Sequence, residues 1–199
     1  MKDYMIGYGS LLSDYSRRTY SGIETDVRPV IATGWRRGWT VRYGDEAATY
    51  AGVRQATGHL LHAALVPTEI TPELRHRERG YDFTEVDPAR VHPDGADRSA
   101  LPDGRYWIVV NREQVRADEA HPIPQTYVDT CLSGCLETGG EARARDFVRT
   151  TELWDAPWVD DRDSPSPLYP RRTVPGPGER ETIDRILAEC GVLTYRRPA

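Results

Sequence analysis

The residues best placed to do chemistry lie near the start of the chain, in the segment "DYMIGYGSLL" (residues 3–12). Its apolar first half is typical of a strand, and two glycines then bracket Tyr8 ahead of Ser10. Glycine allows a positive φ or a close backbone approach, and Ser13-Asp14 with Ser16 is typical of a helix start, because such side chains can accept bonds from first-turn N–H groups. A strand, a glycine-bearing turn and a helix start direct several backbone N–H groups at one point, which favours an anion site. An ordinary strand-to-helix turn is the alternative interpretation.

Composition limits the function classes. The net charge of −5 and the scattered basic residues give no electrostatic case for nucleic acid, and pairs such as Arg171-Arg172 are expected on solvated faces or at local anion contacts. No apolar run approaches the roughly 20 residues that a membrane span needs. The N-terminus has no basic region followed by an apolar stretch. We therefore expect a cytoplasmic protein with no membrane partner.

Cysteine and histidine spacing predicts no metal site. Cys131 and Cys135 are four residues apart, which places them on one helix face, where we expect them to be small buried residues. Cys190 is alone. His59 and His62 are three apart in a segment typical of a strand, so their side chains point to opposite faces. Three cysteines also give no disulfide framework in a cytoplasmic context.

The order of elements indicates an α+β fold in one domain over residues 1–199. The many glycines and prolines fit a loop-rich α+β chain. Alternating residues in "WRRGWTVRY" (35–43) predict a half-buried strand whose basic side chains form a solvated outer face, with the lining of a pocket mouth as the alternative. The expected elements are helices over 15–20, 71–79, 125–138, 141–150 and 179–190, and a first strand with Met5 and Ile6 as its body, followed by strands over 27–33 (an edge or irregular strand, because of Pro29), 35–43, 50–53, 58–66, 81–86 and 106–111.

The end of the chain has a different character. From residue 151 it holds tryptophans, prolines and charges without a clear period, so we distinguish a core of about 1–150 from a C-terminal arm of about 151–199. Aromatic and arginine-rich arms tend to be contact surfaces. The arm is therefore expected to narrow a pocket mouth or to form a homodimer contact, with a purely structural wrap as the alternative.

Three separated segments resemble one family in order and spacing. They are "YGSL" (8–11), "RERGYDFTEV" (77–86) and "PIPQTYVDTCLSGC" (122–135). Together they are similar to the γ-glutamylcyclotransferase-like superfamily, including its γ-glutamylamine type, over roughly residues 3–140. The resemblance implies a small mixed-strand β-barrel surrounded by helices. It says little about the arm.

The resemblance also implies a reaction that needs no cofactor. The free α-amino group of a γ-glutamyl compound attacks its own γ-carbonyl, which releases 5-oxoproline and an amine or amino acid. Only the neutral amine is nucleophilic, so a base must take its proton and can then protonate the departing amine. Glu78 matches the family's glutamate for this role. Glu73 and Glu85 are rival carboxylates, one a first-turn helix residue and the other expected to point outward.

The remaining site residues follow from the same resemblance. Backbone N–H groups of the "YGSL" segment would hold the substrate's carboxylate and the developing charge on its carbonyl oxygen. Ser10 is expected to act as a donor and not as a nucleophile, because no histidine stands at an obvious partner position. A tyrosine in the proline-led segment would contribute a hydroxyl or pack in the core. The predicted substrate-binding residues are Tyr8, Gly9, Ser10, Leu11 and Tyr127.

Two other functions remain open on the same scaffold. One is a binding protein that holds a small anion without turning it over, since a fold does not imply a function. The other is an amide hydrolase that uses Glu78 to activate water. The identity of the departing amine is also open.

Overall fold

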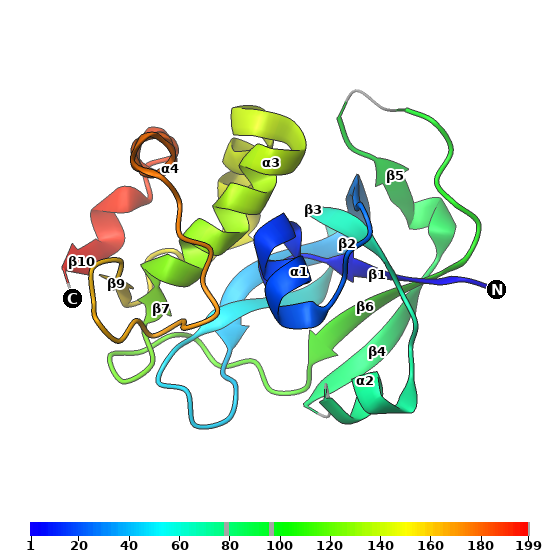
Figure 1. Cartoon of the computed structure of the whole chain (residues 1–199), viewed down its shortest axis with the longest axis horizontal. Helices are drawn as coiled ribbons and strands as arrows, with labels where there is room; N and C mark the ends of the chain where they lie inside the picture. The colour runs from blue at the N-terminus through cyan, green and yellow to red at the C-terminus, as the bar shows by residue number, and fades with distance from the viewer. Residues whose placement is uncertain (78–79, 96–97, 199) are drawn as a thin grey trace.

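The computed structural model describes residues 1–77, 80–95 and 98–198 (Figure 1). The expected α+β class is confirmed. The large sheet contains β1 (Asp3–Gly7), β2 (Arg28–Val41), β3 (Tyr50–Thr68), β4 (Tyr81–Val86), β5 (Val91–Pro93), β6 (Arg105–Asn111) and β8 (Thr151–Glu152). A smaller sheet contains β7 (Ile123–Pro124), β9 (Trp158–Asp160) and β10 (Arg196–Pro198). The helices are α1 (Asp14–Ser21), α2 (Pro72–Arg77), α3 (Gln125–Thr150) and α4 (Pro177–Glu189), with short 3-10 turns η1 (Ser10–Leu12), η2 (Pro88–Arg90) and η3 (Leu193–Tyr195).

The large sheet is mixed, as expected from the family resemblance. Its order is β4-β6-β1-β3-β2-β5, with β8 beside β2, and β1 runs parallel to β6 and antiparallel to β3. Within the described residues, no pairing joins the end strands β4 and β5. Only residues 87–90 connect them, so the two ends lie at most about 18 Å apart. The sheet must therefore curl back on itself, which gives the expected barrel-like shape without a closed ring.

Four expected strands fuse into two. The segments 27–33 and 35–43 form the single strand β2, and the segments 50–53 and 58–66 form β3, because the β2–β3 ladder pairs along nearly its whole length. A register shift beside Gly34, whose φ is +83°, interrupts the ladder after Thr33, whereas Pro29, on which the expected irregularity rested, pairs in register with Ala64. The edge-strand alternative for residues 27–33 is wrong, because β2 pairs with β5 as well as with β3.

Arg37 corrects the expectation of a solvated basic face on residues 35–43. Its side chain is fully buried under the end of α3, with its guanidinium over the Phe147 ring. It donates to the carbonyl oxygens of Tyr8 (3.1 Å), His62 (3.0 Å) and Phe147 (3.3 Å) and to the Thr151 hydroxyl (2.7 Å). Burial lowers the pKa of Arg37 to about 10, so the group keeps its charge at neutral pH. The arginine therefore ties β2 to the end of the strand that leads into the "YGSL" segment.

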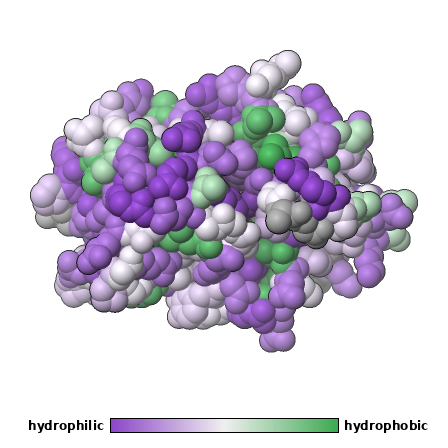
Figure 2. Space-filling view, turned by 90° about the horizontal axis from the view of Figure 1, so that it is seen from above, coloured by the Kyte–Doolittle hydropathy of each residue, from purple (hydrophilic) through white to green (hydrophobic). Residues whose placement is uncertain are grey.

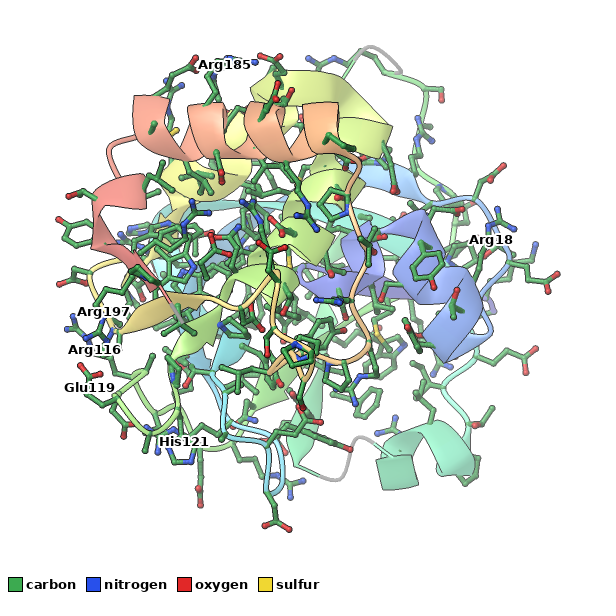
Figure 3. All side chains as sticks on the ribbon, turned by 60° about the vertical axis from the view of Figure 1, so that its left-hand side comes forward. Arg18, Arg116, Glu119, His121, Arg185 and Arg197 are labelled. Carbon is green, nitrogen blue, oxygen red and sulfur yellow. The ribbon has the colours of Figure 1, made fainter. Side chains whose placement is uncertain are left out.

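Helix α3 carries the apolar face expected of residues 125–138. Val128, Cys131, Leu132 and Cys135 are all buried in one cluster, so the prediction of buried cysteines is confirmed. The expected break after residue 138 is also present, because Gly140 has a non-helical φ of +65° within the kinked helix. Its second half packs against α4, where Arg185 bonds to Glu141 and Glu189 at the surface (Figure 3).

The C-terminal arm packs against the core. In Figure 1, the segment of the arm that connects β9 to α4 passes in front of α3. Trp154 and Trp158 are buried, and the Trp154 ring packs edge-on against the Trp39 ring of β2, with the ring centroids 4.8 Å apart.

The face of the molecule seen in Figure 2 is mostly hydrophilic, with small, separate apolar patches. None of the helices in the described part of the chain is both long enough and apolar enough to cross a bilayer.

Asp161 of the arm caps helix α3. The helix has Pro124 as its own N-cap residue, which gives no side-chain capping bond. The buried Asp161 carboxylate instead accepts from the Thr126 N–H (2.9 Å), the Thr126 hydroxyl (2.7 Å) and the Leu168 N–H (2.9 Å). One arm residue thus satisfies the start of α3 and fixes the next turn of the arm.

We expect Asp161→Ala to lower the free energy of unfolding by about 2–4 kcal/mol, because a cap is lost and buried N–H groups are left without an acceptor. Urea unfolding measures the change. Asp163→Ala is the matched control, since that side chain is 93 % exposed and makes one long contact, at 3.4 Å, with Arg180. Equal stability of the two variants would show that Asp161 does not hold the helix.

Candidate functional site

A cavity of about 310 Å³ lies beside the turn that follows β1. Its size falls at the lower end of the range for small-molecule sites. The described walls come from β1, η1, α1, α2, β3, β4, β6, α3 and the arm. All five residues predicted to bind substrate line it: Tyr8, Gly9, Ser10, Leu11 and Tyr127. Segments more than one hundred residues apart in sequence therefore meet at one place.

The turn has the compact geometry that its glycines predict. A Cβ on Gly7 would lie 2.9 Å from the Leu11 Cβ, and a Cβ on Gly9 would collide with the Tyr127 hydroxyl. The first bond inside η1 runs from the Leu12 N–H to the Gly9 carbonyl at 3.0 Å. The N–H groups of Ser10 and Leu11 precede that bond, so they have no acceptor within the turn. Both residues line the cavity, which makes their N–H groups candidate donors to a ligand.

The turn is supported from behind by α1. Ser13 caps α1 by accepting from the Ser16 N–H at 3.4 Å, as its position in the sequence predicts. The buried Arg17 donates to the carbonyl oxygens of Leu11 (2.8 Å) and Leu12 (2.7 Å), and Asp14 pairs with it at 3.1 Å. These bonds hold the carbonyl groups of the turn on the side of α1.

Helix α3 closes against the same turn. Gly134 packs directly on the backbone of Leu12 and Ser13, with no room for a Cβ. The Ser13 hydroxyl also bonds to the Thr173 hydroxyl of the arm at 2.8 Å. The turn is therefore enclosed by α1, α3 and the arm, three elements that lie far apart along the chain.

Tyrosine side chains make up much of the wall. Tyr127 lies at the centre, with ring centroids 4.9 Å from both Tyr50 and Tyr169. Burial raises the pKa of Tyr127 well above its usual value of 10, so its hydroxyl stays protonated at neutral pH and can donate a hydrogen bond. Seven of the chain's eleven tyrosines line the cavity: Tyr8, Tyr20, Tyr43, Tyr50, Tyr81, Tyr127 and Tyr169.

Arg171 brings a positive charge to the cavity. Among the lining residues that the structure describes, it is the one with a charged side chain. Its guanidinium lies 3.3 Å from the Glu46 carboxylate, which also accepts from the Tyr50 hydroxyl. Burial and the Glu46 carboxylate together raise the pKa of Tyr50.

Sequence reasoning did not select Tyr50, Tyr169 or Arg171 for the site. Tyr50 stands in an apolar strand segment, and the two arm residues stand in a stretch without a period. For the two arm residues the signal is composition: an aromatic and arginine-rich arm predicts a narrowed pocket mouth or a dimer contact, and the Arg171-Arg172 pair predicts a solvated face or a local anion contact.

Glu78, the predicted acid and base, lies outside the described residues. Leu74 of α2 and Tyr81 of β4, on either side of it in sequence, both line the cavity. The rival Glu85 has an exposed side chain on β4, as expected, although it lies two residues from the half-buried Phe83 and so on the same face of the strand. In the portion of the chain that the structure covers, no three His, Cys, Asp or Glu side chains are grouped so that they could hold a metal ion.

Comparison with known proteins places the fold. No protein-family model and no curated protein matches the sequence. A solved γ-glutamyl cyclotransferase matches 93 % of this chain and 99 % of its own length, with a TM-score of 0.57 and 12 % identity. YkqA from Bacillus subtilis matches 74 % of this chain with a TM-score of 0.52 and 16 % identity, and the match spans about half, 53 %, of that protein. An uncharacterized protein from Homo sapiens matches 74 % of this chain and 86 % of its own length, with a TM-score of 0.52 and 12 % identity.

Proposed function

We propose that this chain, which has the γ-glutamylcyclotransferase fold, cleaves a γ-glutamyl amide by ring closure and releases 5-oxoproline. The observation that carries the proposal is the cavity itself. It is lined by the whole "YGSL" turn and by Tyr127, which are the binding residues that the family resemblance implies. The shared fold and the named activity of one structural neighbour support the same reaction class.

The chemistry assigns a task to each part of the site. The substrate's α-amine attacks its γ-carbonyl carbon, one carbon–nitrogen bond forms, and the bond to the departing amine breaks. The N–H groups of Ser10 and Leu11 would hold negative charge on the substrate, and the enclosed site strengthens such bonds. The shape of the cavity would bring amine and carbonyl together, which favours an intramolecular reaction.

Glu78 would move the proton in this scheme. It would take a proton from the substrate ammonium and return it to the departing nitrogen, so the carboxylate is restored at the end of each cycle. Support for this role comes from the resemblance of residues 77–86 to the family and from the position of Leu74 and Tyr81 on the cavity wall. No cofactor takes part in any of these steps.

A panel of γ-glutamyl amino acids and γ-glutamyl amines tests the proposal, with products identified by mass spectrometry. We expect 5-oxoproline in equimolar amount with the released amine. Free glutamate would instead indicate hydrolysis by an activated water. Binding of the panel without any product would indicate an anion-binding protein on this fold, and either result would overturn the cyclisation.

A further inference from the structure

We propose that Arg171, which the C-terminal arm supplies, determines specificity by binding a carboxylate on the departing half of the substrate. This inference rests on the proposed function for the orientation of the glutamyl half. It concerns a different residue and a different part of the ligand. It also gives the arm a role in recognition, which the core segments that resemble the family do not provide.

The first argument for this role is the charge of the cavity wall. Arg171 supplies the charged side chain in the described lining, and its neighbours there are tyrosines, serines and apolar residues. A guanidinium has five N–H donors and pairs with carboxylates in a planar, two-point geometry. One contact goes to Glu46 at 3.3 Å, which is long for a charge-assisted bond. Arg171 also forms a side-chain hydrogen bond with Tyr169, and the contacts with Glu46 and Tyr169 leave N–H donors of the guanidinium for a ligand.

The second argument is how deeply the lining residues lie in the cavity. Tyr8 and Tyr127, beside the turn, are only 6 % exposed. The Arg171 side chain is 42 % exposed, and Tyr20 and Tyr43 are 41 % and 42 % exposed. The turn therefore lies at the inner end of the cavity, and Arg171 lies at its outer end with two aromatic rings. If the turn holds the glutamyl half, the departing half meets Arg171.

The third argument is that contacts around Arg171 fix this part of the arm. Arg171 lies over the ring of the buried Tyr169, 5.4 Å from its centroid. The next residues are fixed as well, because Arg172 donates to the Arg162 carbonyl at 2.9 Å and the Thr173 N–H donates to the Thr130 hydroxyl at 2.9 Å. A charged group held by contacts on both sides in sequence, within the arm and with α3, is preorganised for binding, which reduces the entropy lost when a ligand is bound.

Two ligands that differ only in one carboxylate test the proposal. They are γ-glutamyl-phenylalanine and γ-glutamyl-phenethylamine, and their common phenyl group suits the aromatic rim. Titration calorimetry on the full chain carrying Glu78→Gln measures affinity without turnover. We expect the carboxylated ligand to bind about tenfold more tightly, and Arg171→Met to remove that preference. Arg171→Lys should keep part of it, because it retains the charge and loses the two-point geometry.

Arg180→Met is the matched control, because Arg180 lies on α4 with a partly exposed side chain paired with Asp163. It should leave both affinities unchanged. Equal weakening of both ligands by Arg171→Met would overturn the proposal, because it would place Arg171 on the glutamyl half or in a structural role. No preference in the protein with Arg171 intact would overturn it too. The parent protein could also produce no 5-oxoproline while Arg171→Met loses the preference for the carboxylated ligand. That result would support this inference and overturn the proposed reaction.

Discussion

Glu78→Gln is expected to slow the release of 5-oxoproline by about 10²–10⁴-fold, the usual contribution of a positioned acid–base group. Glutamine keeps nearly the same size and can still form hydrogen bonds. It cannot take the proton that blocks the substrate amine, nor return it to the departing nitrogen. We therefore expect the whole loss in kcat with little change in KM, which is the pattern for an interaction made in the transition state.

Glu85→Gln is the control for this experiment. Glu85 lies on β4, seven residues further along, and its side chain is exposed. Its removal should leave kcat within a factor of about two, because surface substitutions away from special features have small effects. The role of Glu78 is rejected if its variant, shown to be folded by circular dichroism, retains more than one tenth of the parent rate. Glu73→Gln would then be the next variant to assay.

The parts of the site that the sequence predicted depend on local rules. The end of β1, the turn and the start of α1 lie within fourteen residues, and each follows from a strand run, a glycine or a capping serine. The kink at Gly140 is equally local. Burial of Cys131 and Cys135 needed only their spacing on one helix face. These features could be predicted without knowing which segments meet.

The parts that the sequence did not predict depend on long-range contacts. Alternation in residues 35–43 places Arg37 on the same face of the strand as Trp35 and Trp39, but it does not show that α3 covers this face and buries the arginine. Tyr50 is separated from Tyr169 by more than one hundred residues, yet their rings meet at 5.5 Å. The Arg171–Glu46 pair spans 125 positions. Such pairings are set by how the arm crosses the core, and no local pattern in the arm encodes that path.

Gly134 carries the second large expected effect, because helix propensity and packing predict opposite signs for Gly134→Ala. In a helix interior, alanine is more favourable than glycine by about 1 kcal/mol. Here the added Cβ would collide with the backbone of Leu12 and Ser13, which cannot turn away as a flexible side chain could. Forced overpacking of this kind costs about 1–3 kcal/mol or more. We expect a net loss of unfolding free energy by urea denaturation, and weaker binding of γ-glutamyl ligands.

The binding effect follows from the position of the contact. Leu12 ends η1, and the N–H groups of Ser10 and Leu11 lie in the same turn. If α3 is forced away from Leu12, these N–H groups move relative to Tyr127, which α3 also carries. Gly178→Ala in α4 is the matched control, because nothing lies within 4 Å of its added Cβ, and it should be neutral or slightly stabilising. If Gly134→Ala has the stability and ligand affinity of the parent, the backbone of the turn can move away from the added Cβ without a loss of unfolding free energy. The close contact would then have no part in shaping the cavity.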